Sequence, residues 1–153
     1  MMSTEPSAKP VGCTNFKLRR LMRRVAQHYD GAMSRAGLKS TQYSLLSNVI
    51  RLGPVKPGEL ARELGMDAST MTRNLQPLLE AGWVAMLPGT DGRSRLIEIT
   101  ESGRAKRQEA QRHWKRAQQE LNALLGTERV LQLHALIDES LDLLSPPADD
   151  NDS

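Results

Sequence analysis

The sequence predicts a mainly α-helical protein with one small β-hairpin, and three observations lead to this fold class. The 153 residues suffice for one domain of ordinary size. Aromatic residues make up only 3% of the chain, so aliphatic side chains and Met must supply most of the buried surface, which suits helix packing. Apolar residues recur every three or four positions over most of the chain, and this period changes only around residues 83–99.

The N-terminal part predicts an arm and two helices. Residues 1–13 are rich in Ser, Pro, Thr and Gly and lack apolar periodicity, so we expect a flexible arm. An amphipathic helix follows over about residues 15–36 and ends at Gly37. A second helix, about residues 41–51, is almost continuously apolar and is therefore expected to be buried.

Two short helices and a hairpin are expected next. Pro57 can occupy the first turn of a helix that stops at Gly65, and Asp67 is a good N-cap for a helix over about residues 68–81. Pro77 removes one hydrogen bond from this helix, so we expect it to be continuous but bent. Strand-like runs at 83–87 and 95–99 flank a turn-rich segment and predict the hairpin.

Two more helices complete the prediction. Thr100 is the expected N-cap of a long polar helix over residues 101–125, and a helix rich in Leu and Ile follows Gly126. This last helix has more apolar residues than a lone exposed helix can hide, so residues 14–36 and 101–145 are predicted to be dimerisation helices. Packing within one chain is the alternative. Residues 146–153 predict a disordered acidic tail.

The two short helices followed directly by a hairpin form a winged helix-turn-helix arrangement, which assigns residues 37–100 to a DNA-binding domain. In this arrangement the second short helix enters the major groove. Its outer face has no Asp or Glu between residues 68 and 79. It carries side chains that contact base edges and phosphates, namely Ser69, Thr70, Thr72, Arg73, Asn74 and Gln76. An ordinary solvated helix face is the alternative.

The hairpin supplies further candidates for DNA contact. Arg93 and Arg95 flank its turn, where arginines can enter the minor groove or bind phosphate. We expect Asp91 to orient Arg93 through a charge-assisted hydrogen bond, and a weak surface ion pair is the alternative. The net charge of +3 permits a double-stranded DNA partner. One module makes few base contacts, so we expect a homodimer on a pseudo-palindromic operator.

Several classes of function are disfavoured. The single cysteine, Cys13, allows no internal disulfide, and no apolar N-terminal segment indicates secretion or a membrane span, so a cytoplasmic location is expected. The three histidines lack metal-ligand spacing, and no catalytic set stands out, so we expect neither an enzyme nor a cofactor. A winged-helix protein-interaction module would need an apolar or acidic outer face on residues 68–79. A thiol peroxidase acting through Cys13 would need a base or a resolving cysteine.

The sequence resembles the MarR family over nearly all of residues 15–145. The matching stretches are GLKSTQYSLL (37–46), ELARELGMDASTMTRNL (59–75), EAGWV (80–84), DGRS (91–94) and ITESG (99–103). The resemblance implies a homodimer, usually a repressor, whose DNA affinity falls when a small aromatic ligand or an oxidant acts in a cleft between the two lobes. It implies DNA contacts by Arg73 and Arg93, and a candidate ligand pocket near Tyr29, Tyr43 and Trp83.

Cys13 is a candidate redox sensor. The hydroperoxide-sensing branch of the family carries its reactive cysteine directly before a Phe-x-Leu run, where this chain has Asn15, and Cys13 lies two residues earlier. Tyr29 and Tyr43 match that branch, whereas Ser40 takes the place of a further tyrosine. A nearby helix N-terminus and Lys17 would favour the thiolate of Cys13. An ordinary thiol beside a flexible arm is the alternative.

Overall fold

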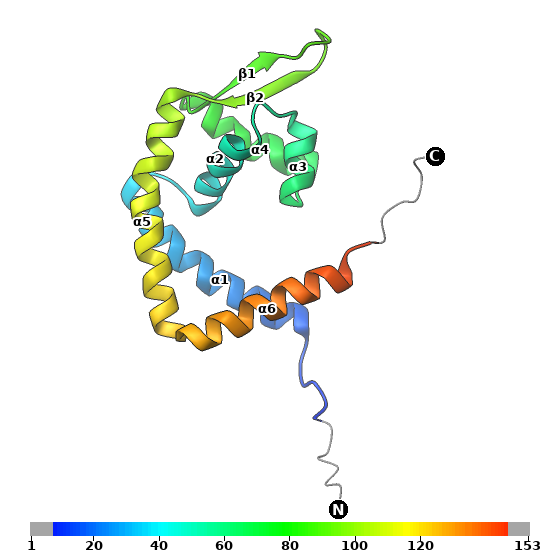
Figure 1. Ribbon diagram of the computed structural model, residues 1–153, viewed down its shortest axis with the longest axis vertical. Helices are drawn as coiled ribbons and strands as arrows, with labels where there is room; N and C mark the ends of the chain where they lie inside the picture. Colours follow the sequence, from blue (N-terminus) through cyan, green and yellow to red (C-terminus); the bar gives the residue numbers. More distant parts are fainter. Residues whose placement is uncertain (1–7, 147–153) are drawn as a thin grey trace, which may run out of the picture.

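The computed structural model describes residues 8–146, so residues 1–7 of the predicted arm and residues 147–153 of the predicted acidic tail lie outside it. The described chain is helical except for one hairpin (Figure 1). Its elements are α1 (Thr14–Met33), the short 3-10 helix η1 (Ser34–Ala36), α2 (Ser40–Leu52), α3 (Pro57–Leu64), α4 (Ala68–Glu80), β1 (Val84–Pro88), β2 (Arg95–Ile99), α5 (Glu101–Leu125) and α6 (Thr127–Leu144). The predicted fold class is confirmed.

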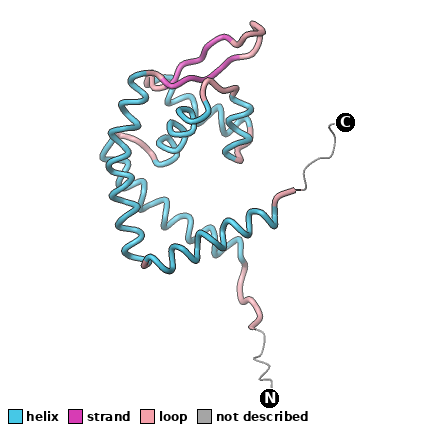
Figure 2. The backbone as a smooth tube through the Cα atoms, viewed as in Figure 1, coloured by secondary structure: helices cyan, strands magenta, loops and turns pink. Residues whose placement is uncertain are grey.

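The elements form two parts joined by one long helix (Figure 2). At one end α2, α3 and α4 lie beneath the β1–β2 hairpin, and α5 runs from the base of this hairpin to the opposite end of the molecule. There α6 turns back at Gly126 and crosses α1 in the view of Figure 1. None of the helices described is long and apolar enough to cross a membrane.

The core lies mainly in the part that contains the hairpin. Leu45, Leu46 and Val49 of α2 are at most 1% exposed, which confirms the burial predicted for this helix. Leu60 of α3 and Leu78 of α4 belong to the same fully buried cluster. Among the described residues no polar or charged side chain is fully buried, so the contacts between the three helices inside the core are apolar.

The helix boundaries agree closely with the predicted ones, with one difference in the first helix. Here α1 ends at Met33 and a 3-10 turn completes the segment up to Gly37, which has a φ of 72°. The positive φ lets the chain turn sharply, and glycine adopts it without steric cost. The Leu38 N–H then donates to the Met33 carbonyl, which closes the turn before α2.

The hairpin has a third backbone partner that the sequence did not indicate. The strands pair antiparallel with Val84 opposite Ile99 and Pro88 opposite Arg95. On the other edge of β2, the Val55 N–H donates to the Ile97 carbonyl at 3.0 Å and the Ile97 N–H donates to the Val55 carbonyl at 2.8 Å. The link between α2 and α3 is therefore hydrogen-bonded to the hairpin, so the helices and the hairpin form one rigid unit.

Candidate nucleic-acid interface

The turn between α3 and α4 is fixed by backbone geometry and by one carboxylate. Gly65 adopts a φ of 64°, and the next N–H, that of Met66, donates to the Ala61 carbonyl at 2.9 Å. This arrangement ends α3 and satisfies its free carbonyl groups. Asp67 then caps α4, because its Oδ1 accepts the Thr70 N–H at 2.7 Å. The sequence predicted both ends of this turn.

The Asp67 carboxylate is held in its charged form. Its Oδ1 accepts the Thr70 N–H and, at 2.8 Å, the Ser69 hydroxyl. These hydrogen bonds favour the anion and lower the pKa of Asp67 to about 2 from 3.8. The cap therefore stays ionised at neutral pH, where it is favourable at the positive end of the α4 dipole.

The outer face of α4 carries the predicted DNA-contacting residues. Met71, Leu75 and Leu78 are at most 3% exposed and turn toward the core. The opposite side leaves four of the six predicted side chains exposed and two at the edges half-buried; the exposed ones are Ser69, Thr72, Arg73 and Gln76, and the half-buried ones are Thr70 and Asn74. The predicted continuity of the helix through Pro77 is confirmed, and the bend expected at this residue stays a prediction.

Most of these side chains also make short-range bonds within the chain. Thr72 donates to the Ala68 carbonyl at 3.0 Å, and the Asn74 amide lies 3.7 Å from the Met66 sulfur. The Arg73 guanidinium has only a 3.4 Å contact with the Thr70 hydroxyl and no carboxylate within ion-pair distance among residues 8–146. Arg73 therefore keeps most of its five N–H donors for an external acceptor.

The tip of the hairpin, which we call the wing, is built around Asp91. Its Oδ1 accepts the Ser94 N–H at 2.9 Å, the Ser94 hydroxyl at 2.7 Å and the Arg93 N–H at 3.0 Å. Hydrogen bonds from Ser94 and from the Arg93 backbone lower the pKa of Asp91 to about 2. The predicted support of Arg93 by Asp91 thus runs through the backbone and not through the guanidinium, because a tight turn brings amide groups to the carboxylate.

The two wing arginines are exposed and uncompensated. Arg93 lies at the tip, and Arg95 begins β2 opposite Pro88. Neither has a carboxylate within ion-pair distance in the part of the chain that the structure describes. The wing therefore presents free positive charge near its tip.

The base of the wing is clamped to the start of α5. The Thr100 hydroxyl donates to the Gly82 carbonyl at 2.6 Å and accepts the Gly103 N–H at 3.1 Å, which confirms the predicted N-cap. The Thr100 N–H donates to the Trp83 carbonyl at 3.0 Å. Gly103 is buried against that carbonyl group, and a Cβ added there would overlap its oxygen. Only glycine at this position lets α5 approach the wing so closely.

A hollow of about 440 Å³ lies between α1, α2 and α5. Trp114 stacks with Tyr29 at 6.4 Å and with Tyr43 at 6.0 Å between ring centroids. Burial raises the pKa of the Tyr29 hydroxyl. The remaining lining residues are mainly polar: Ala26, Ser40, Ser44, Ser47, Arg107 and Gln111. The hollow combines an aromatic wall with hydrogen-bonding groups, the usual character of a small-molecule site.

Two of the three residues predicted for a ligand pocket lie on this hollow. Tyr29 and Tyr43 line it, whereas Trp83 is not among its lining residues. Trp83 lies instead between α4 and β1, where the Lys106 ammonium is 5.7 Å from its ring centroid. Trp114 occupies the third aromatic position, because α5 passes directly beside α1 and α2.

Arg107 is the charged group of this hollow. Its Nε donates to the Ser47 hydroxyl at 3.2 Å, its Nη1 donates to the Gln111 amide oxygen at 3.0 Å, and its guanidinium carbon lies 5.7 Å from the Tyr43 ring centroid. These contacts hold the guanidinium at the wall and leave other N–H groups unused.

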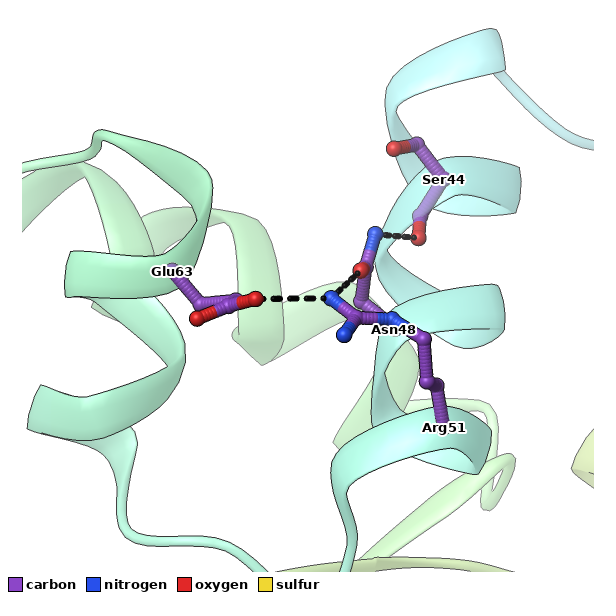
Figure 3. A network of polar contacts seen from close by, with 4 residues as sticks. All are labelled: Ser44, Asn48, Arg51 and Glu63. Atoms are coloured by element: carbon purple, nitrogen blue, oxygen red, sulfur yellow. Dashed lines mark hydrogen bonds and ion pairs between the residues drawn. The ribbon is translucent and has the colours of Figure 1, made fainter.

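A surface network connects α2 to α3 next to this hollow (Figure 3). Arg51 Nη2 donates to the Asn48 side-chain oxygen at 2.8 Å and lies 3.2 Å from Glu63 Oε1, and the Asn48 amide donates to the Ser44 carbonyl at 2.9 Å. The ion-paired side chains are about half exposed, at 55% and 49%, so the pair contributes little stability. It does link a helix that lines the hollow to the first helix of the helix-turn-helix.

Cys13 is exposed and is the N-cap residue of α1. The Lys17 N–H donates to its carbonyl at 3.0 Å. The thiol is therefore open to reagents in solution and lies at the predicted helix start.

Comparison with known proteins gives one consistent result. A family model described as "MarR family" matches residues 36–94. The multiple antibiotic resistance protein MarR of Salmonella typhimurium is 29% identical over 134 residues, which are 86% of this chain and 91% of that protein. The transcriptional regulator MosR of M. tuberculosis, whose crystal structure is in complex with DNA, is 32% identical, with a TM-score of 0.73 over 88% of this chain and 100% of that one.

The chain belongs to the MarR family. A further relative, the uncharacterised HTH-type transcriptional regulator YwoH of Bacillus subtilis, is 32% identical over 87 residues, and the match spans 57% of this MarR-family chain and 64% of that protein. These relatives are transcriptional regulators and not enzymes, in agreement with the prediction. Their winged-helix fold is also the fold of this MarR-family protein.

Three residues that shape this MarR-family site were missed by sequence reasoning. Val55 follows a proline and pairs with β2 as a single residue, so no pattern of alternating apolar and polar residues predicts it. Gly103 lies in the first turn of α5, although glycine is unfavourable within a helix. This unfavourable choice could have indicated a close backbone contact at that position. Trp114 was visible only as one apolar residue of α5, because its partners Tyr29 and Tyr43 lie far away in the sequence.

Proposed function

We propose that this MarR-family protein is a cytoplasmic repressor that binds a pseudo-palindromic operator in double-stranded DNA as a homodimer. One observation carries the proposal: three uncompensated arginines, Arg73 on α4 and Arg93 and Arg95 on the wing, extend from one rigid unit. The DNA complex of MosR, 32% identical to this chain, supports the same mode of binding.

The proposed contacts follow from the shapes of the two elements. In the major groove, the outer face of α4 would read bases, with Arg73 able to form a bidentate hydrogen bond to guanine and Asn74 or Gln76 to adenine. Ser69, Thr70 and Thr72 would contact phosphates or base edges. The wing would follow the adjacent backbone, with Arg93 and Arg95 binding phosphate or entering the minor groove. Most of the affinity would come from charge and most of the specificity from α4.

The homodimer is supported by exposed apolar side chains at the end of the molecule opposite the wing. On α1 these are Phe16, Leu18, Leu21 and Met22, and on α6 they are Leu131, Leu136, Ile137, Leu141, Leu143 and Leu144. A patch of this kind on a protein surface marks an interaction site. A two-fold dimer through these helices would present two copies of α4 to half-sites about one helical turn apart.

The hollow between α1, α2 and α5 would receive a small aromatic ligand that releases the protein from its operator. Tyr43 and Trp114 offer ring faces, and the unused N–H groups of Arg107 would donate hydrogen bonds to an acidic substituent. Because α2 lines the hollow and is linked to α3 through Arg51, a ligand that moves α2 would also move the helix-turn-helix.

Oxidation of Cys13 is a second candidate signal. The observation that favours it is the exposure of this single thiol at the start of α1, beside the proposed dimer contact. A hydroperoxide would oxidise the thiol to a sulfenic acid and would itself be reduced to an alcohol or water. Condensation of the sulfenic acid with the thiol of the partner's Cys13, or with a small thiol, would then form a disulfide with loss of water and alter how α1 packs.

A binding assay with defined DNA tests the proposal. Fluorescence anisotropy would compare the protein on a labelled duplex from its own upstream region with a shuffled duplex of equal length, with and without a panel of aromatic acids. We expect preference for the upstream duplex, two protomers per duplex, and release by at least one acid. Arg107→Met should abolish the response to the acid, whereas Arg112→Met, an exposed cation of α5 that does not line the hollow, should preserve it. Equal affinity for both duplexes would overturn the proposal and favour a protein-interaction module.

A further inference from the structure

The N-terminal half of α1 carries five exposed cations and no acid. They are Lys17, Arg19, Arg20, Arg23 and Arg24. None of them has a carboxylate within ion-pair distance among residues 8–146. Several stand three or four positions apart, a spacing at which like charges on a helix repel each other. An anion that contacts several of these side chains at once would relieve the repulsion.

Three of these arginines surround a recess on the surface of α1, which we call the arginine recess. It has a volume of about 300 Å³ and is lined by Arg20, Arg23, Arg24 and Gln27. Spacings of three, four and seven residues place these side chains on one face of the helix. All four carry N–H donors, and no acid lies among the lining residues. The arginine recess therefore favours an anion.

The arginine recess continues into a second depression along α1. This depression, of about 270 Å³, shares Arg20 and Arg24 with the recess and adds Lys17 and Leu21 to the lining. The Arg20 guanidinium carbon also lies 5.8 Å from the Phe16 ring centroid, and this cation–π contact restrains its orientation. An anion longer than a single phosphate can therefore lie across both depressions.

The arginine recess faces away from the apolar stripe of α1. Leu18, Met22 and Val25 recur at helical spacing and belong to that stripe. Arg20 stands two residues from both Leu18 and Met22, and Arg23 stands two residues before Val25. Two residues correspond to about 200° around an α-helix, so the arginines lie on the opposite side. A homodimer that buries the apolar stripe would leave the recess open to solvent.

The number of donors in the recess indicates which anion fits. Each guanidinium can donate two parallel hydrogen bonds to a phosphate, so three of them exceed the about four acceptor positions of one carboxylate. A diphosphate group has more acceptor oxygens and more negative charge. The volume of the recess lies at the lower end of the range for small-molecule sites, so it suits a small ligand and not a nucleic-acid duplex.

We propose that the arginine recess binds a small molecule that carries a diphosphate or triphosphate group. Pyrophosphate and nucleoside di- and triphosphates share this chemistry. Arg20, Arg23 and Arg24 bind the phosphate oxygens, and the Gln27 amide donates a further hydrogen bond. The recess shares no lining residue with the hollow between α1, α2 and α5, and it lies at the end of the molecule opposite the wing (Figure 1). The site therefore does not depend on the proposed function.

Isothermal titration calorimetry on the full chain, without divalent metal and at constant ionic strength, tests the site. The probes are pyrophosphate, adenosine triphosphate and sulfate. We expect pyrophosphate to bind the wild type more tightly than sulfate does. Arg20→Gln with Arg23→Gln should weaken pyrophosphate binding about tenfold or more, because charge-assisted hydrogen bonds are lost. Arg104→Gln with Arg112→Gln, which removes the same charge from exposed positions of α5, should leave the affinity unchanged.

Two further variants separate the recess from a general effect of charge. Arg23→Lys keeps the charge but loses the paired donors, so it should bind pyrophosphate more weakly than the wild type and more tightly than the double variant. Arg93→Gln with Arg95→Gln removes the exposed cations of the wing and should bind pyrophosphate as the wild type does. Circular dichroism should show equal helix content throughout, because Gln and Lys are both good helix formers.

The outcomes are distinct from those for operator binding. Equal affinity of the wild type for pyrophosphate and sulfate would overturn the site, as would equal losses in the α1 and α5 double variants. Loss of pyrophosphate binding in the wing variant alone would assign the anion to the DNA interface and also overturn it. Tighter binding of adenosine triphosphate than of pyrophosphate would support a nucleotide as the ligand, whereas equal binding would support recognition of the phosphate groups alone. None of these results depends on whether the protein prefers its upstream duplex.

Discussion

Replacement of Gly103 by alanine tests the close approach of α5 to the wing. An added Cβ would overlap the Trp83 carbonyl oxygen and would lie 2.8 Å both from the carbonyl carbon and from Ile99 Cδ1, whereas ordinary contact begins at 3.4 Å. Relief of the two 2.8 Å contacts alone needs a separation of roughly 0.6 Å, and relief of the overlap with the oxygen needs more, which strains a packed junction. The same movement lengthens the hydrogen bond from the Thr100 N–H to the Trp83 carbonyl, now 3.0 Å.

Overpacking of this kind costs about 1–3 kcal/mol, and the lost hydrogen bond raises the expected cost to roughly 2–4 kcal/mol. Alanine favours a helix over glycine by about 1 kcal/mol, so the net destabilisation should be roughly 1–3 kcal/mol. For a domain of this size, that corresponds to a fall in Tm of roughly 2–12 °C. Thermal unfolding at a fixed protomer concentration would measure it, because association shifts the Tm.

Gly31→Ala is the matched control. Gly31 also lies within a helix, but an added Cβ there meets nothing within 4 Å. This variant should be more stable than the wild type by about 0.5–1 kcal/mol. If Gly103→Ala raises the Tm as Gly31→Ala does, α5 and the wing are not in close contact at Gly103.

Three other predictions concern DNA contact, acid pH and oxidation. Arg73→Ala should weaken binding to the operator by about 1–3 kcal/mol and have little effect on binding to shuffled DNA. Arg93→Ala should weaken binding to the operator and to shuffled DNA alike, and should reduce the slope of log affinity against log salt concentration by about 1. Equal losses on both DNAs for both variants in anisotropy titrations would argue against base readout by α4. The folded-state pKa values of Asp67 and Asp91 are about 2, so the stability that these carboxylates contribute is complete above about pH 4 and is lost as the pH falls through 2. Urea unfolding of the Asp67→Asn, Asp91→Asn variant should therefore show a smaller loss of stability between these pH values than the wild type shows. An equal loss in both proteins would contradict the lowered pKa values. Cys13→Ser should bind the operator normally and resist release by an organic hydroperoxide, and equal release of both proteins would exclude this thiol as the sensor.

Local signals made most of the fold predictable. Gly65, Asp67 and Thr100 act on backbone groups within a few residues, so their sequence positions sufficed to predict the helix ends that the structure shows. The polar face of α4 could also be predicted from the sequence, because Met71 and Leu75 are buried at helical spacing and this determines which side chains face outward.

Long-range packing was not predictable in the same way. The hollow forms where α1, α2 and α5 meet, and whether Trp83 or Trp114 reaches it depends on how these helices cross. The role of Asp91 also depended on the backbone path of the wing tip, since the turn brings the Arg93 and Ser94 N–H groups, and not the guanidinium, to the carboxylate.

Because α5 is continuous, a movement at the hollow is transmitted to both ends of this helix. Its 25 residues form one uninterrupted rod about 38 Å long. One end is clamped to the wing at Thr100 and Gly103, the hollow lies against its first and middle turns between Arg107 and Trp114, and the far end carries α6. A tilt of about 5° around the hollow moves the far end by roughly 2 Å, which in the proposed homodimer would be enough to change the spacing between the two wings.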